Sequence, residues 1–197
     1  MTRSCPRDAA RSHISCCKTG LRTDWISRKL PAGKFGRVMK FSTRQDIEAP
    51  IEFVFARAAD FGAYERQALR RGFGIGRDDQ LKAIGRGMRW KAQFPFRGKV
   101  RELRGELTRF DAPNSFLIQS VSGGVEADFD IEFLPLSRNR TRVTVGLELS
   151  PKTLSARLFV QSLKFSKRNL DKQFAKRVAL FGGNIESRYE RDAVSRA

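Results

Sequence analysis

Cysteine and histidine are confined to one end of the chain, which restricts the chemistry open to the rest. Cys5, Cys16, Cys17 and the one histidine, His13, all precede Met39. From Met39 onward, Ser-His-Asp and Cys-His nucleophilic catalysis are excluded, and the usual zinc ligands are missing. His13, Cys16 and Cys17 are too closely spaced for a zinc site, which needs separated ligand pairs. We therefore expect no metal and no cofactor, and any reaction must use carboxylates, lysine, arginine, tyrosine or water.

A row of carboxylates occupies alternate positions of the segment from Val125 to Phe133: Glu126, Asp128, Asp130 and Glu132. The alternation predicts a strand with these side chains on its outer face. General acid-base groups need an enclosed setting, and alternate positions of a flat strand do not surround a metal ion. We expect a solvated face whose acids meet cross-strand partners such as Arg142. No catalytic residue is assigned.

Arg101 is the charged residue of most interest. It shares parity with Leu103 and Leu107 on a strand predicted from Lys99 to Arg109, whereas Val100 and Phe110 fall on the opposite face. A guanidinium on the inner face could pair with a carboxylate or phosphate of a ligand. The alternative is solvent exposure near the end of the strand. The two tyrosines of the chain receive no role.

Length and composition predict one domain with a tail. The chain has 197 residues, of which 40% are hydrophobic, and no apolar run approaches the roughly 18 residues of a membrane-spanning helix. It carries 39 basic and 21 acidic residues, a net charge of +18 that favours nucleic acid, anionic membrane surfaces or acidic partners. We expect a folded domain over residues 39–191 and a tail over 192–197. A domain without cysteine fits a reducing, cytoplasmic setting.

Residues 1–38 form a separate, basic segment without periodicity, which we interpret as a disordered N-terminal extension. Its arginine- and serine-rich, acid-poor composition is typical of an organelle transit peptide. The alternative is an over-extended gene start, with translation beginning at Met39.

Hydrophobic periodicity predicts an α+β domain. A first strand (Lys40 to Ile47) is followed by two short helices (Ile51 to Ala58 and about Ala63 to Leu69) and then by further antiparallel strands. The glycine-rich segment from Arg70 to Gly87 is a twisted strand or a loop. Apolar steps of three, four and seven predict one long helix from Thr153 to Arg188.

This order is that of a helix-grip fold, in which a curved antiparallel sheet of about six or seven strands wraps around a long C-terminal helix. The chain here resembles the START-like superfamily, often labelled SRPBCC, which includes polyketide cyclase-like and lipid-transfer proteins. The likeness spans Met39 to Arg191. It is carried by Ile47–Phe55 with Asp60-Phe61, by Gly87–Trp90, by Phe110–Pro113, and by Leu134-Pro135 followed by Thr141–Val143.

The resemblance implies a cavity between the sheet and the last helix. The inward residues, with Arg101 at the mouth, would line it: Trp90, Phe94, Leu103, Leu107, Phe129, Ile131, Val143, Val145 and Leu147 from strands, and Phe159, Leu163 and Phe174 from the helix. The alternative is that the same side chains fill a solid core.

Three functions follow as hypotheses. The first is a binding protein for one small hydrophobic or amphipathic ligand, lipid-like or quinone-like. The second is an enzyme of the polyketide cyclase or aromatase type that acts through pocket shape. The third is a basic surface that binds an anionic membrane or nucleic acid, the latter being the least favoured partner. The basic face of the last helix could touch such a membrane, but it is also what the wet face of a soluble helix looks like, and Asp171 interrupts it.

Overall fold

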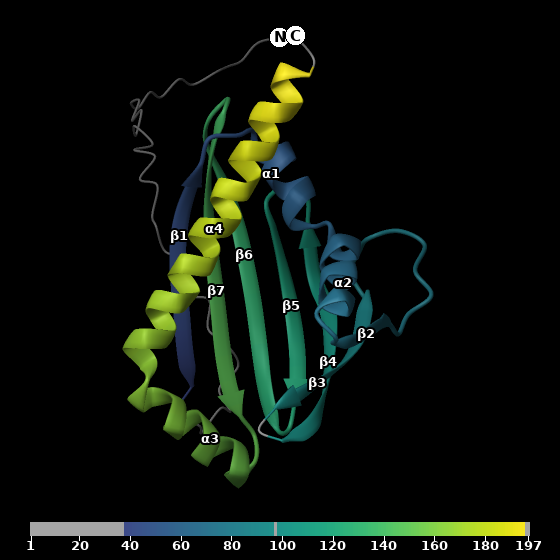
Figure 1. Ribbon diagram of the computed structural model, residues 1–197, viewed down its shortest axis with the longest axis vertical. Helices are drawn as coiled ribbons and strands as arrows, with labels where there is room; N and C mark the ends of the chain where they lie inside the picture. Colours follow the sequence, from purple (N-terminus) through teal and green to yellow (C-terminus); the bar gives the residue numbers. More distant parts are fainter. Residues whose placement is uncertain (1–37, 97, 196–197) are drawn as a thin grey trace, which may run out of the picture. The chain divides into compact units, whose positions relative to one another are not determined.

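The structure, a computed structural model, describes residues 38–96 and 98–195 (Figure 1). In this part of the chain one antiparallel sheet has the strand order β1-β7-β6-β5-β4-β3-β2. The strands are β1 (Met39–Ile47), β2 (Gly74–Arg77), β3 (Arg89–Phe96), β4 (Lys99–Asp111), β5 (Ser115–Ser122), β6 (Val125–Ser137) and β7 (Arg140–Pro151). The helices are α1 (Ile51–Ala58), α2 (Phe61–Arg70), α3 (Leu154–Phe165) and α4 (Lys167–Val194). The helix-grip prediction is confirmed.

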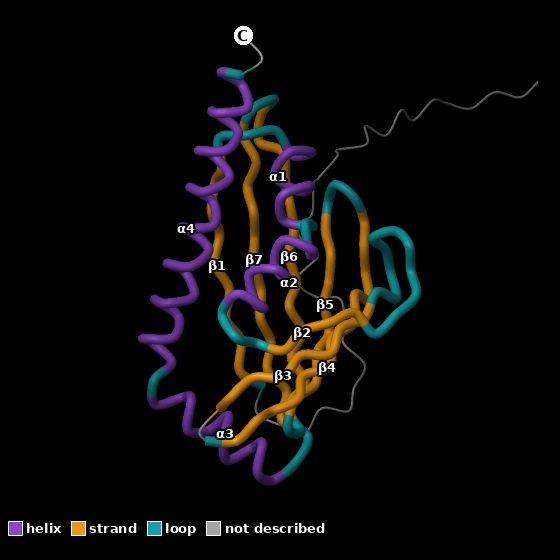
Figure 2. The backbone as a smooth tube through the Cα atoms, turned by 45° about the vertical axis from the view of Figure 1, so that its right-hand side comes forward, coloured by secondary structure: helices purple, strands orange, loops and turns teal. Residues whose placement is uncertain are grey.

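The strands that alternate most regularly in sequence, β6 and β7, are neighbours inside the sheet. β6 and β7 pair with Phe129 opposite Leu147 and Ile131 opposite Val145. Ile131 and Val145 are buried beneath the helices, as their parity predicted. The helices lie together on this inner face, with α4 along the side of β1 and β7 and with α1 and α2 beside it (Figure 2).

A bulge in β4 explains the mixed parity of its sequence. The pairing with β5 shifts register between Leu107 and Arg109, so that Thr108 is an extra residue. Beyond the bulge, the positions that simple alternation would place on the outer face point inward instead. Phe110, predicted on the outer face, therefore turns inward and packs 5.5 Å from the ring of Phe55. That prediction was wrong because alternation cannot locate an unpaired residue.

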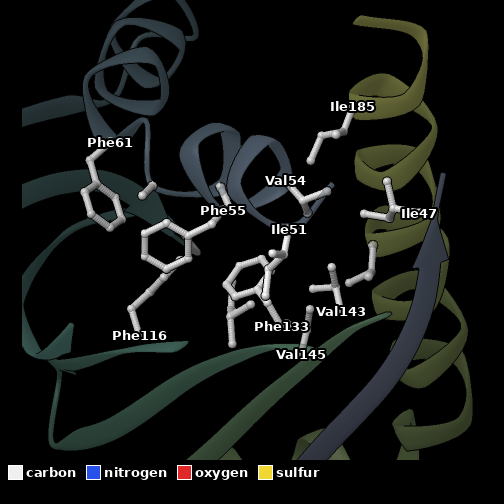
Figure 3. Packing of buried hydrophobic residues seen from close by; sticks show 14 of the residues in the cluster. Ile47, Ile51, Val54, Phe55, Phe61, Phe116, Phe133, Val143, Val145 and Ile185 are labelled. Carbon is white, nitrogen blue, oxygen red and sulfur yellow. The ribbon is translucent and has the colours of Figure 1, made fainter. Parts of the chain in front are cut away.

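Phenylalanine rings close one end of the inner face (Figure 3). Phe55 of α1 lies with its ring centroid 6.1 Å from that of Phe116 and 5.3 Å from that of Phe133. Phe61 of α2 contacts Phe116 and Trp90 edge-on at 5.5 and 5.2 Å. Each such pair adds about 0.5–1.5 kcal/mol to the free energy of burial. The two short helices are therefore fixed to the sheet by aromatic contacts.

The long helix predicted from Thr153 to Arg188 is two helices. α3 ends and α4 begins at Ser166, whose φ of −103° and ψ of 10° are not helical. The apolar step from Leu163 to Leu170 is seven residues, so the stripe stays in phase across the break and periodicity does not reveal it. α4 also runs to Val194, three residues beyond the expected end of the domain at Arg191.

The interpretation of residues 1–38 as an N-terminal extension concerns residues that, Val38 apart, lie outside the described part of the chain. It stays a prediction.

α4 approaches β1 closely at Gly182. A Cβ atom there would lie 3.4 Å from Cγ1 of Ile47 and 2.9 Å from Cγ of Gln45, and the second distance is shorter than real Cβ atoms show. The neighbouring Gly183 faces open space. Only Gly182 is therefore required for the contact between helix and strand.

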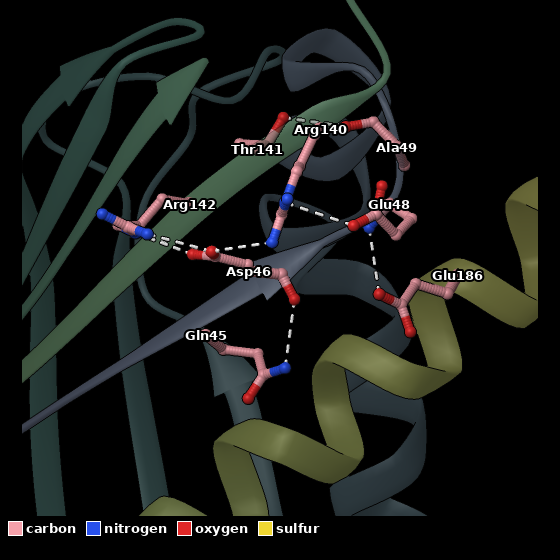
Figure 4. Close-up of polar contacts among 8 residues, drawn as sticks. All are labelled: Gln45, Asp46, Glu48, Ala49, Arg140, Thr141, Arg142 and Glu186. Atoms are coloured by element: carbon pink, nitrogen blue, oxygen red, sulfur yellow. Dashed lines mark hydrogen bonds and ion pairs between the residues drawn. The ribbon is translucent and has the colours of Figure 1, made fainter. Parts of the chain in front are cut away.

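A polar cluster fixes the turn between β1 and α1 (Figure 4). Asp46 accepts hydrogen bonds from Nε and Nη2 of Arg142 at 2.7 and 2.9 Å, and Arg140 bridges Asp46 and Glu48 at 3.3 and 3.2 Å. Glu186 of α4 accepts from the backbone N–H of Glu48 at 2.9 Å. The cluster thus joins β1, β7 and α4. The Arg142 hydrogen bonds hold the pKa of Asp46 below its ordinary value of 3.8.

We predict opposite effects for alanine at the two adjacent glycines. Gly183→Ala should stabilise the protein by about 0.5–1 kcal/mol, because alanine restricts the unfolded chain and favours helix. Gly182→Ala should destabilise it by about 1 kcal/mol, because steric displacement of Gln45 and Ile47 exceeds that gain. Thermal unfolding of both variants measures this. Equal stabilisation by both substitutions would show that α4 does not approach β1 this closely.

We predict that Asp46→Asn lowers the melting temperature at neutral pH but has little effect in acid. A carboxylate whose folded-state pKa is lowered stabilises the protein above its ordinary pKa, and that stability is lost as the pH falls through the folded-state pKa. The difference from the wild type should therefore shrink below about pH 4. Glu106→Gln, which removes an exposed carboxylate outside the cluster, is the control. A difference that is independent of pH would contradict the prediction.

Candidate functional site

A cavity of about 530 Å³ lies between the sheet, α2 and α4, and we call it the inner cavity. Its wall is mainly apolar, with Tyr64, Glu65 and Arg177 as its polar side chains. The lining residues are Ala58, Phe61, Tyr64, Glu65, Ile75, Trp90, Phe116, Ile118, Phe129, Ile131, Val145, Leu147, Phe174, Arg177, Val178 and Phe181. The volume is within the usual range for small-molecule sites, about 300–1,000 Å³.

A second cavity of about 380 Å³, the end cavity, lies beneath α3. It is more polar than the inner cavity, since it contains one guanidinium and several hydroxyl groups. Its lining residues are Phe94, Arg101, Leu103, Ser120, Ser122, Gly123, Val125, Ala127, Leu149, Ser155, Ala156 and Phe159.

The two cavities lie over neighbouring sets of cross-strand residues on the same face of the sheet. Phe129, in the inner cavity, pairs with Ile118 and Leu147. Ala127, two residues along and in the end cavity, pairs with Ser120 and Leu149. Because side chains two apart on a strand share a face, the cavities adjoin along the sheet. A molecule that lies along β5 and β6 would pass from apolar walls to polar ones.

Arg101 brings a positive charge to the end cavity, and its side chain is also exposed to solvent, which was the alternative considered from the sequence. Its Nη1 atom lies 3.4 Å from the position that a Cβ atom would take at Gly123, so the guanidinium reaches the turn between β5 and β6. No carboxylate of the described residues pairs with it. The hydroxyl groups of Ser122 and Ser120 donate to the carbonyl oxygens of Glu102 and Ala127, at 2.7 and 3.4 Å. Arg101 therefore offers the donors best suited to an anion.

Two of the three polar side chains of the inner cavity are engaged by the protein, whereas Arg177 has no carboxylate partner among the described residues. Glu65 accepts a hydrogen bond of 2.6 Å from the indole N–H of Trp90. The Tyr64 hydroxyl donates to the carbonyl oxygen of Arg57 at 3.2 Å. Desolvation, with the nearby charge of Asp60, raises the pKa of Tyr64 to about 12. Tyr64 is therefore neutral at physiological pH and a poor general base.

The residues predicted from strand and helix parity divide between three places. Trp90, Phe129, Ile131, Val145, Leu147 and Phe174 line the inner cavity. Phe94, Arg101, Leu103 and Phe159 line the end cavity. The others line neither: Leu107 and Val143 are fully buried in the core, and Leu163 packs beside Met39, Phe41 and Val160.

Sequence reasoning missed the contributions of α2, β5 and the middle of α4. For β5 a signal exists, because Phe116, Ile118 and Ser120 alternate in the strand that ends near the turn at Gly123. For α2 there is none, since Phe61 is its only fully buried side chain and no apolar stripe marks Tyr64 and Glu65 as inward.

Three of the four carboxylates of the β6 row have cross-strand or neighbouring partners, as expected of an outer face. Arg109 bonds Asp130 at 2.5 Å, Gln119 donates to Asp128 at 3.1 Å, and Lys152 pairs with Glu126 at 3.0 Å. Burial, with Asp130 nearby, raises the pKa of Glu132. Arg142, expected as a partner, is instead bound to Asp46, because it lies opposite Leu134 in the register.

The described part of the chain lacks two kinds of functional element. It contains no group of three or more histidine, cysteine, aspartate or glutamate side chains placed to hold a metal ion. No helix within it is both long enough and apolar enough to cross a membrane.

The comparisons with known proteins give the fold. No protein-family model and no curated protein sequence matches the chain. Among solved structures it is similar to TTHA0849 from Thermus thermophilus (TM-score 0.53, 18% identity, 78% of this chain and 99% of that one).

It is also similar to the Zhui aromatase/cyclase from Streptomyces sp. R1128 (TM-score 0.51, 12% identity, 77% and 95%) and to Ara h 8.0201 (TM-score 0.50, 13% identity, 76% and 99%). Strand order and these likenesses agree on the fold: the chain has a helix-grip fold, as its resemblance to the START-like (SRPBCC) superfamily implied.

Proposed function

We propose that the protein binds one amphipathic small molecule that carries an acidic head group. The apolar part lies in the inner cavity beneath α4, and the head lies in the end cavity against Arg101. The observation that carries the proposal is an apolar cavity that adjoins a polar one whose guanidinium has no carboxylate partner among the described residues.

The two parts of such a ligand would contribute differently. Burial of the apolar part contributes about 25 cal/mol per Å² removed from water. The head group would form a charge-assisted hydrogen bond with Arg101, worth about 1.5–3 kcal/mol. A neutral ligand, such as a quinone, would gain the first contribution without the second. The order of cavities along the sheet therefore favours an acidic, lipid-like molecule.

The polyketide cyclase or aromatase alternative has weaker support. The fold is compatible with it, and Tyr64 and Glu65 do face the inner cavity. However, Glu65 is hydrogen-bonded to Trp90, and the raised pKa of Tyr64 keeps its proton in place. A general acid-base pair needs a proton that is exchanged near the working pH. The residues that line the inner cavity therefore support ligand binding better than they support cyclase or aromatase catalysis.

We predict that Arg101→Gln weakens binding of dodecanoate about tenfold or more and leaves binding of dodecanol almost unchanged. Displacement of the neutral fluorescent probe N-phenyl-1-naphthylamine measures both affinities. Compared with Arg101→Gln, Arg101→Lys should restore part of the preference for dodecanoate over dodecanol. Lysine keeps the positive charge but lacks the planar guanidinium that can donate two parallel hydrogen bonds.

Two controls make this test specific. Arg104→Gln removes a cation from the same strand that is already paired with Glu102 at 2.9 Å, and it should change neither affinity. Arg177→Gln removes the guanidinium of the inner cavity. If Arg177→Gln rather than Arg101→Gln abolishes the preference for dodecanoate, the proposed orientation of the ligand is wrong. If neither compound displaces the probe from the wild type, the binding function itself is wrong.

A further inference from the structure

α3 is apolar on two opposite faces. On one face Ala156 and Val160 are buried against the sheet, and Phe159 lines the end cavity. On the other face Leu158 is 68% exposed and Phe165 is 94% exposed. Large apolar side chains scattered singly over a surface need no explanation, but a helix that repeats them on its wet face does.

The exposed residues form one stripe. Leu154, which is 78% exposed, Leu158 and Phe165 are separated by steps of four and seven residues. These steps place side chains above one another on an α-helix, and the buried Ala156 and Val160 fall on the opposite side. No other part of the described chain covers this stripe, since all three side chains are more than two thirds exposed.

The surroundings of the stripe are basic. From Lys152 to Leu170 the sequence has five basic residues and no acidic one: Lys152, Arg157, Lys164, Lys167 and Arg168. Lys152 and Lys167 pair with Glu126 and Asp171, which lie outside this segment. The other three have no carboxylate partner within the described residues, so their charges are available to an external anionic partner.

We propose that α3 docks on the surface of an anionic lipid bilayer, with Leu154, Leu158 and Phe165 inserted among the lipids and Arg157, Lys164 and Arg168 at the phosphate groups. An apolar stripe flanked by cations is the pattern of an interfacial helix. Nucleic acid would use the cations but leave the leucines in water. A second copy of the chain would cover the leucines but would bring three unpaired cations against three.

The docking surface lies on the helix that covers the end cavity, which bears on how a ligand could enter or leave. α3 covers the end cavity with Ser155, Ala156 and Phe159 while its opposite face carries the stripe. A docked molecule would therefore place the cover of this cavity at the bilayer surface. The docking proposal does not rest on the proposed ligand, because the stripe and the charges lie outside both cavities.

Co-sedimentation of the full chain with vesicles tests the proposal. The wild type should bind vesicles of phosphatidylcholine with phosphatidylserine more tightly than vesicles of phosphatidylcholine alone, and added salt should remove this difference. Leu158→Ser with Phe165→Ser should weaken binding to the anionic vesicles about tenfold or more. Arg157→Gln with Lys164→Gln should weaken it by about fivefold per charge, only on the anionic vesicles.

A matched pair on α4 controls for the loss of exposed apolar surface. Leu180 and Val194 are 59% and 78% exposed, so Leu180→Ser with Val194→Ser removes similar groups from another place. This variant should bind vesicles as the wild type does. Circular dichroism should show every variant folded, since none of these side chains is buried.

Three outcomes would overturn the proposal. The first is that the wild type binds neither kind of vesicle. The second is that the α3 and α4 variants lose binding equally, which would place the contact outside the stripe. The third is that duplex DNA or RNA displaces the protein from anionic vesicles and binds the serine variant of α3 as tightly as the wild type, which would identify a nucleic-acid surface.

Discussion

The close contact of α4 with β1 at Gly182 is the constraint on which the space inside this protein depends. A glycine at this point lets the helix lie close to the first strand, where the side chains of Gln45 and Ile47 occupy the space that a Cβ atom would need. The helix is thereby held along one side of the sheet, and Glu186 secures it to the start of α1. Since α4 cannot also cover β4 and β5, the rest of the inner face must be closed by α1 and α2 or left hollow.

The inward side chains differ in size and polarity along the strands, and with them the character of the cavity that they line. Along β5 they decrease from Phe116 to Ile118 and then to Ser120. At the large end, Phe55 packs on Phe116, and Phe116 also lines the inner cavity. At the small end, Ala127 of β6 lies opposite Ser120, and no ring from α1 or α2 reaches them. The gradient of side-chain size and polarity along β5 therefore separates the larger, apolar cavity from the smaller, polar one.

This gradient explains how far the sequence could predict the structure. Alternation in β6 and β7 was sufficient for the sheet, and parity correctly placed Arg101 and Leu103 on the same sheet face as Trp90, although Arg101 is exposed there. It could not detect the bulge at Thr108 or the break at Ser166, because both depend on how elements fit a curved surface and not on local pattern. Alternation also could not distinguish Leu107, which is buried in the packed core, from Leu103, which lines a cavity four residues earlier in β4. Both are leucines on the same face of the strand.

The break at Ser166 divides the helical cover of the two cavities into α3 and α4, which are held to the sheet by different numbers of contacts. α4 is held by a glycine contact, by aromatic rings and by a carboxylate, whereas α3 buries only the small side chains of Ala156 and Val160 completely. Local opening costs free energy in proportion to the contacts that it breaks. Amide protons of α3 should thus exchange with solvent through fluctuations that leave the sheet and α4 intact. The residence time of an occupant would then be governed by a twelve-residue element and not by the unfolding of the domain.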